Sequence, residues 1–418
     1  MGREGNAMKK YALCGASGRG FSMYAKGITT GFSDVAHLAG IFDINPMRAA
    51  YVRDSVDESR RIPVYTDFDR MICETAPDTV IVATMDSVHH EYVVRALDLG
   101  CDVICEKPMT IDAEKTSAIL EAEKRNGRKI IVTFNCRFMP YVKRVKELLR
   151  GGAIGRALSV DFEWLLDRRH GADYFRRWHK FQKNGGGLLV TKATHHFDMV
   201  NWWIEKEPVK VYADGELSFY GPGRDRRAER CRECPYYEDC ELAMEGFDDL
   251  AGADSREYLN GMYFKPEKID GYKRDQCVFA PSDIYDNMSL SVRYTGGVLM
   301  TYSLNAYTPY EGWRVAINGT DGRLEARQAT WGSGAQEQAI RVYTPDGKET
   351  VHHVPAGEGD HGGSDRVLLE WLLRERPQDP LGQIAGSREG ALSLLVGAAA
   401  NISIQSGNPV FLRDLIEL

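Results

Sequence analysis

Several titratable side chains crowd into one short stretch of this chain, directly after three consecutive glycines. The stretch is NGGGLLVTKATHHFD, residues 184–198, and it contains Lys192, His195 and His196. Glycine leaves the backbone free to pass close to a ligand. A packed core does not call for so many charged groups, because burying them is costly. A site in which a histidine carries a proton beside a bound ligand does call for them.

A lysine that follows a buried-type strand is a second candidate proton carrier. DVICEKP, residues 102–108, is an apolar strand that ends in Lys107. Such a lysine is costly unless its amine lies in a cleft, and the alternative is a lysine that snorkels to the surface. TMDSVH, residues 84–89, follows another strand. Doubly wound sheets bind ligands at such strand ends, which adds three candidate cofactor contacts: Thr84, His89 and Glu106.

A glycine-rich turn, GASGRG, follows the first predicted strand and opens a helix. It keeps the first and last glycines of the dinucleotide fingerprint G-x-G-x-x-G, with serine at the middle position and a glycine beside it. Backbone amides at such a turn can receive a pyrophosphate. The alternative is a tight turn without a ligand. The candidate cofactor contacts of this turn are Gly15, Ser17, Gly18, Arg19 and Gly20.

An acidic residue, Asp43, ends the second predicted strand. A carboxylate there accepts hydrogen bonds from the ribose hydroxyls of the adenosine half of a dinucleotide. It also repels a 2′-phosphate, so the sequence favours NAD over NADP. Arg48 is close enough in sequence to weaken this preference. The alternative for Asp43 is an N-cap of the helix that starts at Pro46, a role that Asn45 could fill instead.

Apolar strands alternate with helices through the first part of the chain, which predicts a parallel, doubly wound sheet. After about residue 156, strands and hairpins with Gly-rich turns predict an open antiparallel sheet. We therefore expect an α/β protein with a Rossmann domain over residues 1–136 and an α+β domain over residues 137–418, the latter containing a polar insert at about 221–281. The expected strands of the first domain are 11–15, 37–44, 78–84, 102–108 and 129–135, its helices include 46–56 and 112–127, and further helices are expected near 364–375 and 387–405.

The totals exclude several classes of protein. A chain of 418 residues is long enough for two domains. Its net charge of −7 argues against a nucleic-acid partner. We find no apolar run of about 20 residues, as a membrane span requires, and no signal peptide at the start. Nine cysteines, several in apolar strands, fit a reduced, cytoplasmic setting.

The chain resembles the glucose–fructose oxidoreductase, inositol dehydrogenase and MocA (Gfo/Idh/MocA) family of NAD(P)-dependent oxidoreductases. The resemblance rests on GASGRG, TMDSVH, CEKP, the RF pair at 137–138 and GGGLLVTKATHHFD, and it continues through LNAYTPYEGWRVAINGTDGRLE and HGGSD. It implies a Rossmann domain and an open antiparallel sheet that joins copies into a homodimer or homotetramer. It also implies a small-molecule substrate among the sugars, cyclitols and related polyols.

The resemblance also assigns roles near the nicotinamide ring. It implies that Lys107 and His195 face this ring and that His195 exchanges the proton of the substrate hydroxyl. The aspartate that the family carries four residues before this histidine is Thr191 here. A hydroxyl can orient an imidazole but cannot stabilise its cation as a carboxylate does. At helical spacing from both histidines, Lys192 would keep His195 neutral, as a general base must be.

Substrate contacts are expected from a basic segment, DRRHGADYFRRWHK, residues 167–180. Its arginines could bind hydroxyls or carboxylates, as in acidic sugars, and Trp178 offers an apolar platform. The alternative is a solvated loop with surface salt bridges. For His196 the alternative is a buried structural ring, and a metal site from His195, His196 and Asp198 matches no zinc signature. The candidate substrate contacts are Arg137, Arg168, His170, Tyr174, Trp178 and His196.

Cysteines in the insert suggest a metal. RCRECPYYEDCE contains a C-x-x-C pair, the common half of a structural zinc site. A polar insert also needs some staple to hold its fold. We therefore expect a structural zinc; an iron–sulfur cluster and reduced, unliganded thiols are the alternatives. The candidate ligands are Cys231, Cys234, Cys240 and Cys277.

Taken together, these patterns predict an NAD-dependent dehydrogenase that transfers hydride between nicotinamide and a secondary hydroxyl of a sugar, cyclitol or sugar acid. One alternative is an NAD-dependent glycoside hydrolase that works by transient oxidation and elimination, which Thr191 and Lys192 keep open. A second is a dinucleotide-binding sensor. Lys107 and His195 argue against the sensor, because a sensor needs no proton relay.

Overall fold

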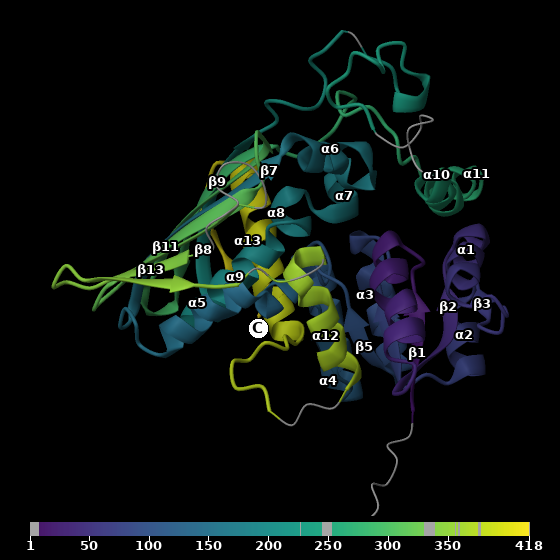
Figure 1. Cartoon of the computed structure of the whole chain (residues 1–418), viewed down its shortest axis with the longest axis horizontal. Coiled ribbons are helices and arrows are strands. Elements are labelled where there is room, and N and C mark those ends of the chain that lie inside the picture. The colour runs from purple at the N-terminus through teal and green to yellow at the C-terminus, as the bar shows by residue number, and fades with distance from the viewer. Residues whose placement is uncertain are drawn as a thin grey trace, which may run out of the picture.

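Two β-sheets divide the chain between them and lie at opposite ends of its long axis (Figure 1). The structure is a computed structural model, and it describes residues 8–225, 227–244, 253–329, 339–355, 357, 360–374 and 378–417. One sheet is wholly parallel, and the other is mixed. The predicted combination of an α/β domain with a second, sheet-containing domain is confirmed.

The parallel sheet has the strand order β3-β2-β1-β4-β5-β6. This order reverses direction between β1 and β4, and the carboxyl ends of strands at such a reversal open a crevice for ligands. Because helices cover both faces, the carboxyl-terminal parts of β1, β4 and β5 are apolar and buried. The strands are β1 (Lys9–Cys14), β2 (Ala36–Phe42), β3 (Val64–Tyr65), β4 (Thr79–Val82), β5 (Asp102–Cys105) and β6 (Ile130–Val132).

Three helices of this domain, α1, α2 and α4, begin after a residue whose side chain caps the helix: Asn45, Asp67 and Asp112. Asn45 accepts a hydrogen bond from the amide of Met47 at 3.1 Å and caps α1, so the alternative of Asp43 as this cap is wrong. Pattern reading missed β3 and α2, since a two-residue edge strand offers no periodicity. The helices are α1 (Pro46–Val56), α2 (Phe68–Thr75), α3 (His89–Asp98), α4 (Ala113–Asn126) and α5 (Pro140–Arg150).

The second sheet has the order β14-β13-β12-β11-β7-β10-β9-β8-β15. We expected it to be antiparallel, but β7 and β10 pair in parallel. The reason is topological: β10 and β11 follow each other and run in opposite directions, and β7 lies between them, so it must be parallel to one. The strands are β7 (Ala157–Asp167), β8 (Pro208–Glu216), β9 (Asn287–Tyr294), β10 (Leu299–Thr308), β11 (Gly312–Gly319), β12 (Arg323–Ala329), β13 (Ala339–Tyr343), β14 (Glu349–His353) and β15 (Val410–Phe411).

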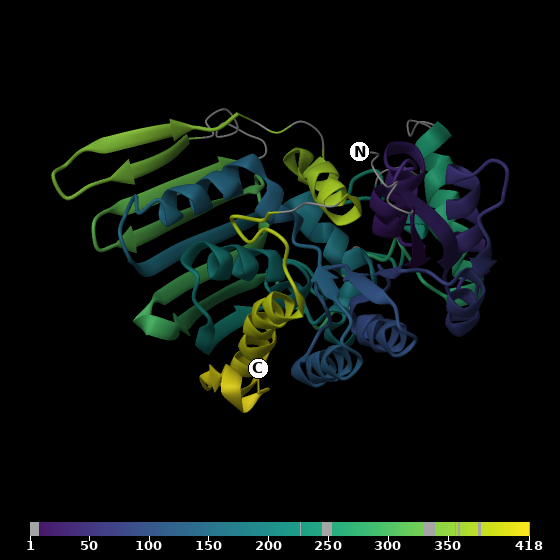
Figure 2. The same cartoon turned by 90° about the horizontal axis from the view of Figure 1, so that it is seen from below.

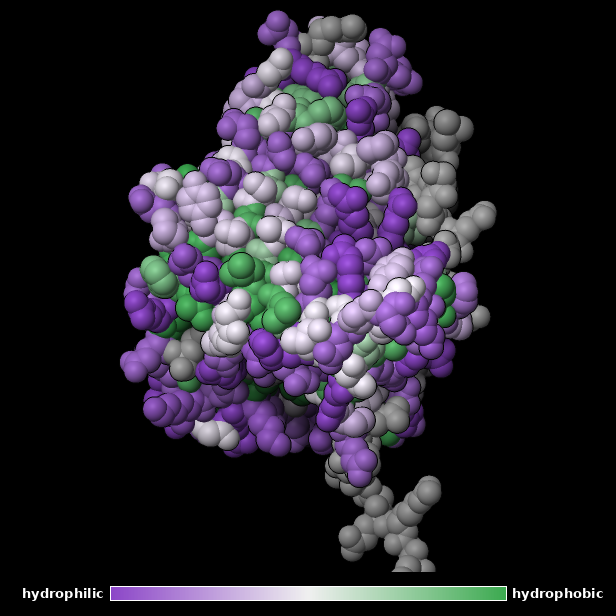
Figure 3. Space-filling view, turned by 90° about the vertical axis from the view of Figure 1, so that its left-hand side faces the viewer, coloured by the Kyte–Doolittle hydropathy of each residue, from purple (hydrophilic) through white to green (hydrophobic). Residues whose placement is uncertain are grey.

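One face of this sheet packs on helices, and the other is open (Figures 1 and 2). Burial alternates along β9, as expected of a sheet with one covered face. Figure 3 views the end of the molecule where this sheet lies and shows apolar side chains among hydrophilic ones. Leu158, Tyr212 and Leu299 are exposed apolar residues of its strands.

The other helices carry the cleft-facing residues or cover the sheets. The predicted helices near 364–375 and 387–405 are confirmed as α12 and α13. Among the helices that the structure describes, none is long and apolar enough to cross a membrane. They are α6 (Arg168–Arg176), α7 (Gln182–Gly185), α8 (Leu188–Thr191), α9 (Thr194–Ile204), α10 (Ala253–Leu259), α11 (Glu267–Asp270), α12 (Ser364–Leu373) and α13 (Ser387–Ser406).

The insert does not stay with the sheet from which it leaves. Its helices α10 and α11 lie beside α1, at the far end of the parallel sheet (Figure 1). The insert therefore reaches from one domain to the other.

Candidate active site

A cleft of about 1250 Å³ runs between the two sheets and collects most of the predicted site residues. The parallel-sheet side contributes Gly15, Ser17, Gly18, Arg19, Asp43 and Arg48, together with Thr84, His89, Glu106 and Lys107 from the ends of β4 and β5. The opposite side contributes His170, Tyr174, Trp178, Thr191, Lys192, His195 and His196. The cleft lies at the point where the strand order of the parallel sheet reverses.

The glycine turn after β1 has the form of a dinucleotide cradle. Gly15 has φ of +100°, and a Cβ there would lie 2.6 Å from the carbonyl oxygen of Ala83. Ser17 accepts a hydrogen bond from the amide of Gly20 at 3.0 Å. A Cβ on Gly20 would lie 2.3 Å from the carbonyl oxygen of Gly15, so Gly20 closes the turn from behind. The backbone thus approaches the cleft without side chains in the way, as a pyrophosphate requires.

Asp43 lies directly after β2, at the predicted ribose position. Its carboxylate accepts hydrogen bonds from the amides of Ala16 and Asn45, both at 2.8 Å, and pairs with Arg48 at 3.3 Å. Burial raises the pKa of Asp43, although Arg48 and the two amides oppose this shift. Arg48 is itself held on its other side by Asp270 of the insert at 2.6 Å.

Arg19 and Glu106 line the cleft, but their charged groups already have protein partners. Arg19 donates to Glu106 at 3.0 Å and to both oxygens of Asp365 at 2.7 and 2.9 Å. Tyr24 donates to Glu106 at 2.6 Å. Burial would raise the pKa of Glu106, yet Arg19, Tyr24 and Lys107 together lower it. These contacts anchor the glycine turn to α12, and the role of Arg19 and Glu106 as cofactor contacts stays a prediction.

His89, predicted as a cofactor contact, lines the cleft, but its two ring nitrogens lie next to protein carbonyl groups. Its Nδ1 lies 2.9 Å from the carbonyl oxygen of Pro108, and its Nε2 lies 3.2 Å from that of Thr84. Both ring nitrogens thus face the backbone at the ends of β4 and β5. Burial lowers the pKa of His89, which favours the neutral ring. The imidazole ties the two strand ends together.

The centre of the cleft holds an arrangement that includes a residue missing from the predictions. Thr191 donates its hydroxyl hydrogen to Asp86 at 2.7 Å, so this hydrogen does not orient His195 as expected. The amine of Lys107 donates to the carbonyl oxygen of Thr191 at 3.1 Å. Burial lowers the pKa of Lys107 and raises that of Asp86 to about 7, with Lys107 and Thr191 opposing the rise. A carboxylate after a strand end, in TMDSVH, was the available signal for Asp86.

The three glycines explain how the opposite wall reaches this centre. Gly186 and Gly187 have φ of +72° and +73°, which turn the chain between α7 and α8. The expected helix around the histidines is broken, because Lys192 lies between α8 and α9. Helical spacing therefore does not describe Lys192, whose amine lies 5.3 Å from the ring centre of Trp164. His195 is the second residue of α9, is 9% exposed and lines the same cleft as Lys107.

His196 matches the alternative of a structural ring. It is fully buried, its Nδ1 lies 2.6 Å from the hydroxyl oxygen of Tyr302, and its ring stacks on Trp164 at 3.7 Å. Burial lowers the pKa of His196 well below its ordinary value. We therefore assign its ring to the packing of the wall rather than to a substrate contact.

Two predicted substrate arginines lie elsewhere. Arg137 is buried and donates to both oxygens of Asp198 at 2.6 and 2.8 Å. It is not among the described residues that line the cleft. Arg168 pairs with Glu241 at 3.2 Å on the surface. The pair with Arg137 also uses Asp198, which had been weighed as a metal ligand. His170, Tyr174 and Trp178 do line the cleft, and Nδ1 of His170 lies 2.8 Å from Glu311.

The predicted structural zinc is not supported. Sulfur atoms around one tetrahedral zinc lie about 3.8 Å apart, given bonds of about 2.3 Å. Among the residues that the structure describes, the one group of three His, Cys, Asp or Glu ligand atoms within 4.8 Å of one another is Asp167, His170 and Glu311. The four cysteines, Cys231, Cys234, Cys240 and Cys277, instead line a small pocket of the insert.

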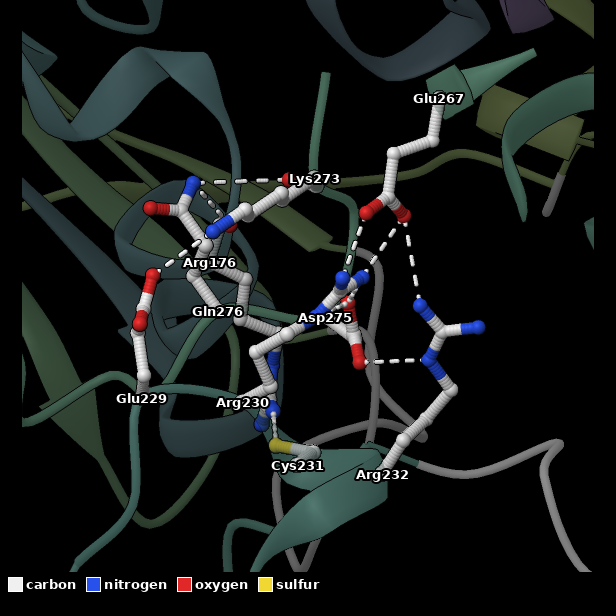
Figure 4. A network of polar contacts seen from close by, with 9 residues as sticks. All are labelled: Arg176, Glu229, Arg230, Cys231, Arg232, Glu267, Lys273, Asp275 and Gln276. Carbon is white, nitrogen blue, oxygen red and sulfur yellow. Dashed lines mark hydrogen bonds and ion pairs between the residues drawn. The ribbon is translucent and has the colours of Figure 1, made fainter. Parts of the chain in front are cut away.

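Ion pairs hold the insert where zinc was expected. Arg230 donates to Glu267 at 2.7 Å and to the fully buried Asp275 at 2.9 Å (Figure 4). Arg232 reaches the same two carboxylates, and Arg176 donates to the sulfur of Cys231 at 3.1 Å (Figure 4). These ion pairs therefore link segments of the insert that a zinc ion was expected to hold together.

Comparisons with known proteins agree with this architecture. Residues 9–134 match a family model described as "Oxidoreductase family, NAD-binding Rossmann fold", and residues 146–412 match its C-terminal alpha/beta domain. The chain is 36% identical over 428 residues to "Putative oxidoreductase YteT" of Bacillus subtilis (strain 168), covering 98% of this chain and 99% of that protein.

More distant proteins are similar as well. Inositol 2-dehydrogenase of Rhizobium meliloti (strain 1021) is 29% identical over 205 residues, which cover 49% of this chain and 57% of that protein. The solved structure of the WlbA dehydrogenase from Bordetella pertussis, in complex with NADH and UDP-GlcNAcA, superposes with a TM-score of 0.64 at 16% identity, covering 97% of this chain and 99% of that chain. This last likeness concerns the fold.

Proposed function

The chain belongs to the Gfo/Idh/MocA family of oxidoreductases, and from this premise we propose that it is an NAD-dependent dehydrogenase acting on a secondary hydroxyl of a sugar, cyclitol or sugar acid. One observation carries the proposal: Lys107, Asp86 and His195 line one cleft together with the glycine turn. Proton carriers and a dinucleotide cradle in one cavity suit the oxidation of an alcohol.

The cradle fits an NAD molecule. Bound there, NAD supplies the carbon that accepts or returns a hydride. The amides of the glycine turn would hold the pyrophosphate, and Asp43 would accept hydrogen bonds from the adenosine ribose. Thr84 and Lys107, at the ends of the next strands, would flank the nicotinamide half. These assignments use the residues that the cleft exposes at the carboxyl ends of β1, β2, β4 and β5.

The side chains at the centre would handle the hydroxyl proton. His195 accepts it as general base, and Lys107 polarises the hydroxyl oxygen. Asp86 takes the place of the carboxylate that the family carries at the position of Thr191, since it reaches the same spot from the other side of the cleft. With a pKa of about 7, Asp86 can accept or release a proton at neutral pH.

A second candidate function is an NAD-dependent glycoside hydrolase that oxidises, eliminates and reduces again. The observation that favours it is Asp86, because a carboxyl group partly protonated at neutral pH can act as the acid for a leaving oxygen. A dinucleotide sensor is less well supported, because a sensor needs no proton carriers such as Lys107 and Asp86.

A substrate screen separates the two. The purified protein is incubated with NAD and either free sugars, cyclitols and sugar acids or the matching aryl glycosides. The proposed dehydrogenase accumulates NADH with a free polyol. Release of the aglycone without net NADH, lost when NAD is stripped from the protein, would overturn the dehydrogenase and establish the hydrolase.

Copies of the chain offer one surface for association. We infer that the open face of the nine-stranded sheet, with Tyr212 and Leu299 exposed on its strands, joins copies into a homodimer or homotetramer (Figure 3). Exposed apolar patches on a sheet favour such contacts.

A further inference from the structure

Residues 255–276 of the insert, here called the strap, lie across the end of the cleft where the glycine turn and Asp43 are found. We propose that the strap closes the adenosine end of the dinucleotide site, that its Asp270 excludes cofactors with a 2′-phosphate, and that the strap retains the bound dinucleotide between turnovers. This inference rests on the proposed function in one respect, namely that the cleft binds NAD.

The strap docks on the parallel-sheet domain through buried polar contacts. Asp270 accepts hydrogen bonds from Arg48 at 2.6 Å and from Asn45 at 2.9 Å. Arg48 also donates to the carbonyl oxygen of Met262 at 3.0 Å, and Asn45 to that of Pro266 at 2.8 Å. Arg48 and Asn45 belong to the segment directly after β2, so the strap is fixed beside the predicted ribose position.

These contacts decide the local charge. Arg48 lies between two carboxylates, Asp43 at 3.3 Å and Asp270 at 2.6 Å. One guanidinium thus faces two anions, which leaves this end of the cleft negative. A 2′-phosphate would meet that charge, whereas a 2′-hydroxyl can donate a hydrogen bond to it. Without Asp270, Arg48 would be available to a 2′-phosphate, as arginine is in NADP sites.

Aromatic residues of the strap form a roof over the glycine turn. The hydroxyls of Tyr258 and Tyr263 lie 3.3 Å apart, and a Cβ on Gly18 would lie 2.9 and 3.2 Å from them. The ring of Tyr258 stacks on Phe21 at 6.3 Å. A Cβ on Gly261 would lie 2.2 Å from the ring of Tyr51, so the strap packs on α1 without a gap.

The other end of the strap is anchored to the opposite wall. Arg274 pairs with Asp173 of α6 at 2.6 Å, and Gln276 donates to the carbonyl oxygen of Arg176 at 3.1 Å (Figure 4). Arg230 holds the strap at Glu267 and Asp275 (Figure 4). The strap therefore joins both walls of the cleft, and a dinucleotide beneath it leaves only after one set of these contacts opens.

The test measures binding of NADH and NADPH to dinucleotide-stripped protein, together with the release rate of NADH in a chase. In Asp270→Asn we expect the preference for NADH over NADPH to fall by about tenfold or more, and release to quicken by about tenfold, the effect of roughly 1.4 kcal/mol from one buried charge pair. Glu257→Gln removes an exposed carboxylate of the strap; it is the matched control and keeps the wild-type values.

A second variant separates retention from specificity. Arg274→Gln loosens the anchor on α6 but not the one on Arg48, so NADH release should quicken while the NADH-to-NADPH preference stays as in the wild type. If both variants keep the wild-type NADH-to-NADPH preference and the wild-type NADH release rate, the proposed role of the strap is wrong. Wild-type protein that binds neither dinucleotide would contradict the proposed function as well, which distinguishes the two failures.

Discussion

At the scale of single residues, the central feature is a carboxylate supplied from across the cleft. The family pattern has an aspartate four residues before the histidine, and Thr191 stands there. Asp86, on the other side of the cleft, accepts a hydrogen bond from the Thr191 hydroxyl at 2.7 Å. It lines the same cleft as Lys107 and His195. Asp86 was missing from the predicted site because 105 residues separate it from Thr191, and no local pattern predicts such a pair.

The pKa of Asp86 makes a prediction about pH. The folded value of about 7 lies above the ordinary 3.8, so the folded protein keeps a proton that the unfolded chain releases between these values. This buried carboxyl group therefore costs stability as pH rises from about 4 to 7. If Asp86 must be ionised to assist His195, turnover of the folded enzyme rises around pH 7, and this limb of the pH profile is lost in Asp86→Asn.

The measurement is kcat against pH for the wild type and Asp86→Asn. Asp98→Asn, an exposed carboxylate at the end of α3, serves as the control and should leave the profile unchanged. Persistence of the limb near pH 7 in Asp86→Asn would assign it to another group.

At the scale of elements, α9 needs a rigid base in order to hold His195. Arg137 supplies it, since it binds Asp198 on α9 with both partners buried. Arg137 was predicted to contact substrate, but in the part of the chain that the structure describes it pairs with Asp198 and does not line the cleft. A buried arginine and a buried carboxylate stabilise each other, and removing one leaves the other charged in a poor solvent.

Arg137→Ala should therefore lower the free energy of unfolding by about 3–5 kcal/mol. Arg144→Ala removes a half-buried ion pair with Glu147 at the surface of α5 and should cost less than about 1 kcal/mol. Denaturant unfolding of both variants checks this. If Arg137→Ala keeps the wild-type stability and raises KM, Arg137 contacts the substrate and does not mainly stabilise the fold.

The elements that the sequence predicted well are those with their own periodicity or caps. Continuous apolar runs predicted β1, β2, β4, β5 and β6, and Asn45 before Pro46 marked the start of α1. The parallel pairing of β7 with β10 was missed, because strand direction depends on which strands become neighbours across long connections.

At the scale of the whole molecule, the insert was the least predictable part. Its cysteine spacing suggested zinc, but Arg230, Glu267 and Asp275 hold it by ion pairs instead. Its contact with the other domain joins Arg48 to Asp270, 222 residues apart. Partners so distant in sequence leave no local signal, so the closure of the cleft became visible only in the folded chain.

One measurement tests the central claim, that the cleft between the two sheets oxidises a polyol hydroxyl with NAD, most directly. It compares Lys107→Ala with the wild type on the substrate found in the screen, following NADH formation and, separately, NADH binding by fluorescence. Lys129→Ala, an exposed lysine before β6, is the control. We expect Lys107→Ala to lose about 10²–10⁴-fold in turnover and to keep wild-type NADH affinity. Near-wild-type turnover in Lys107→Ala would contradict the central claim.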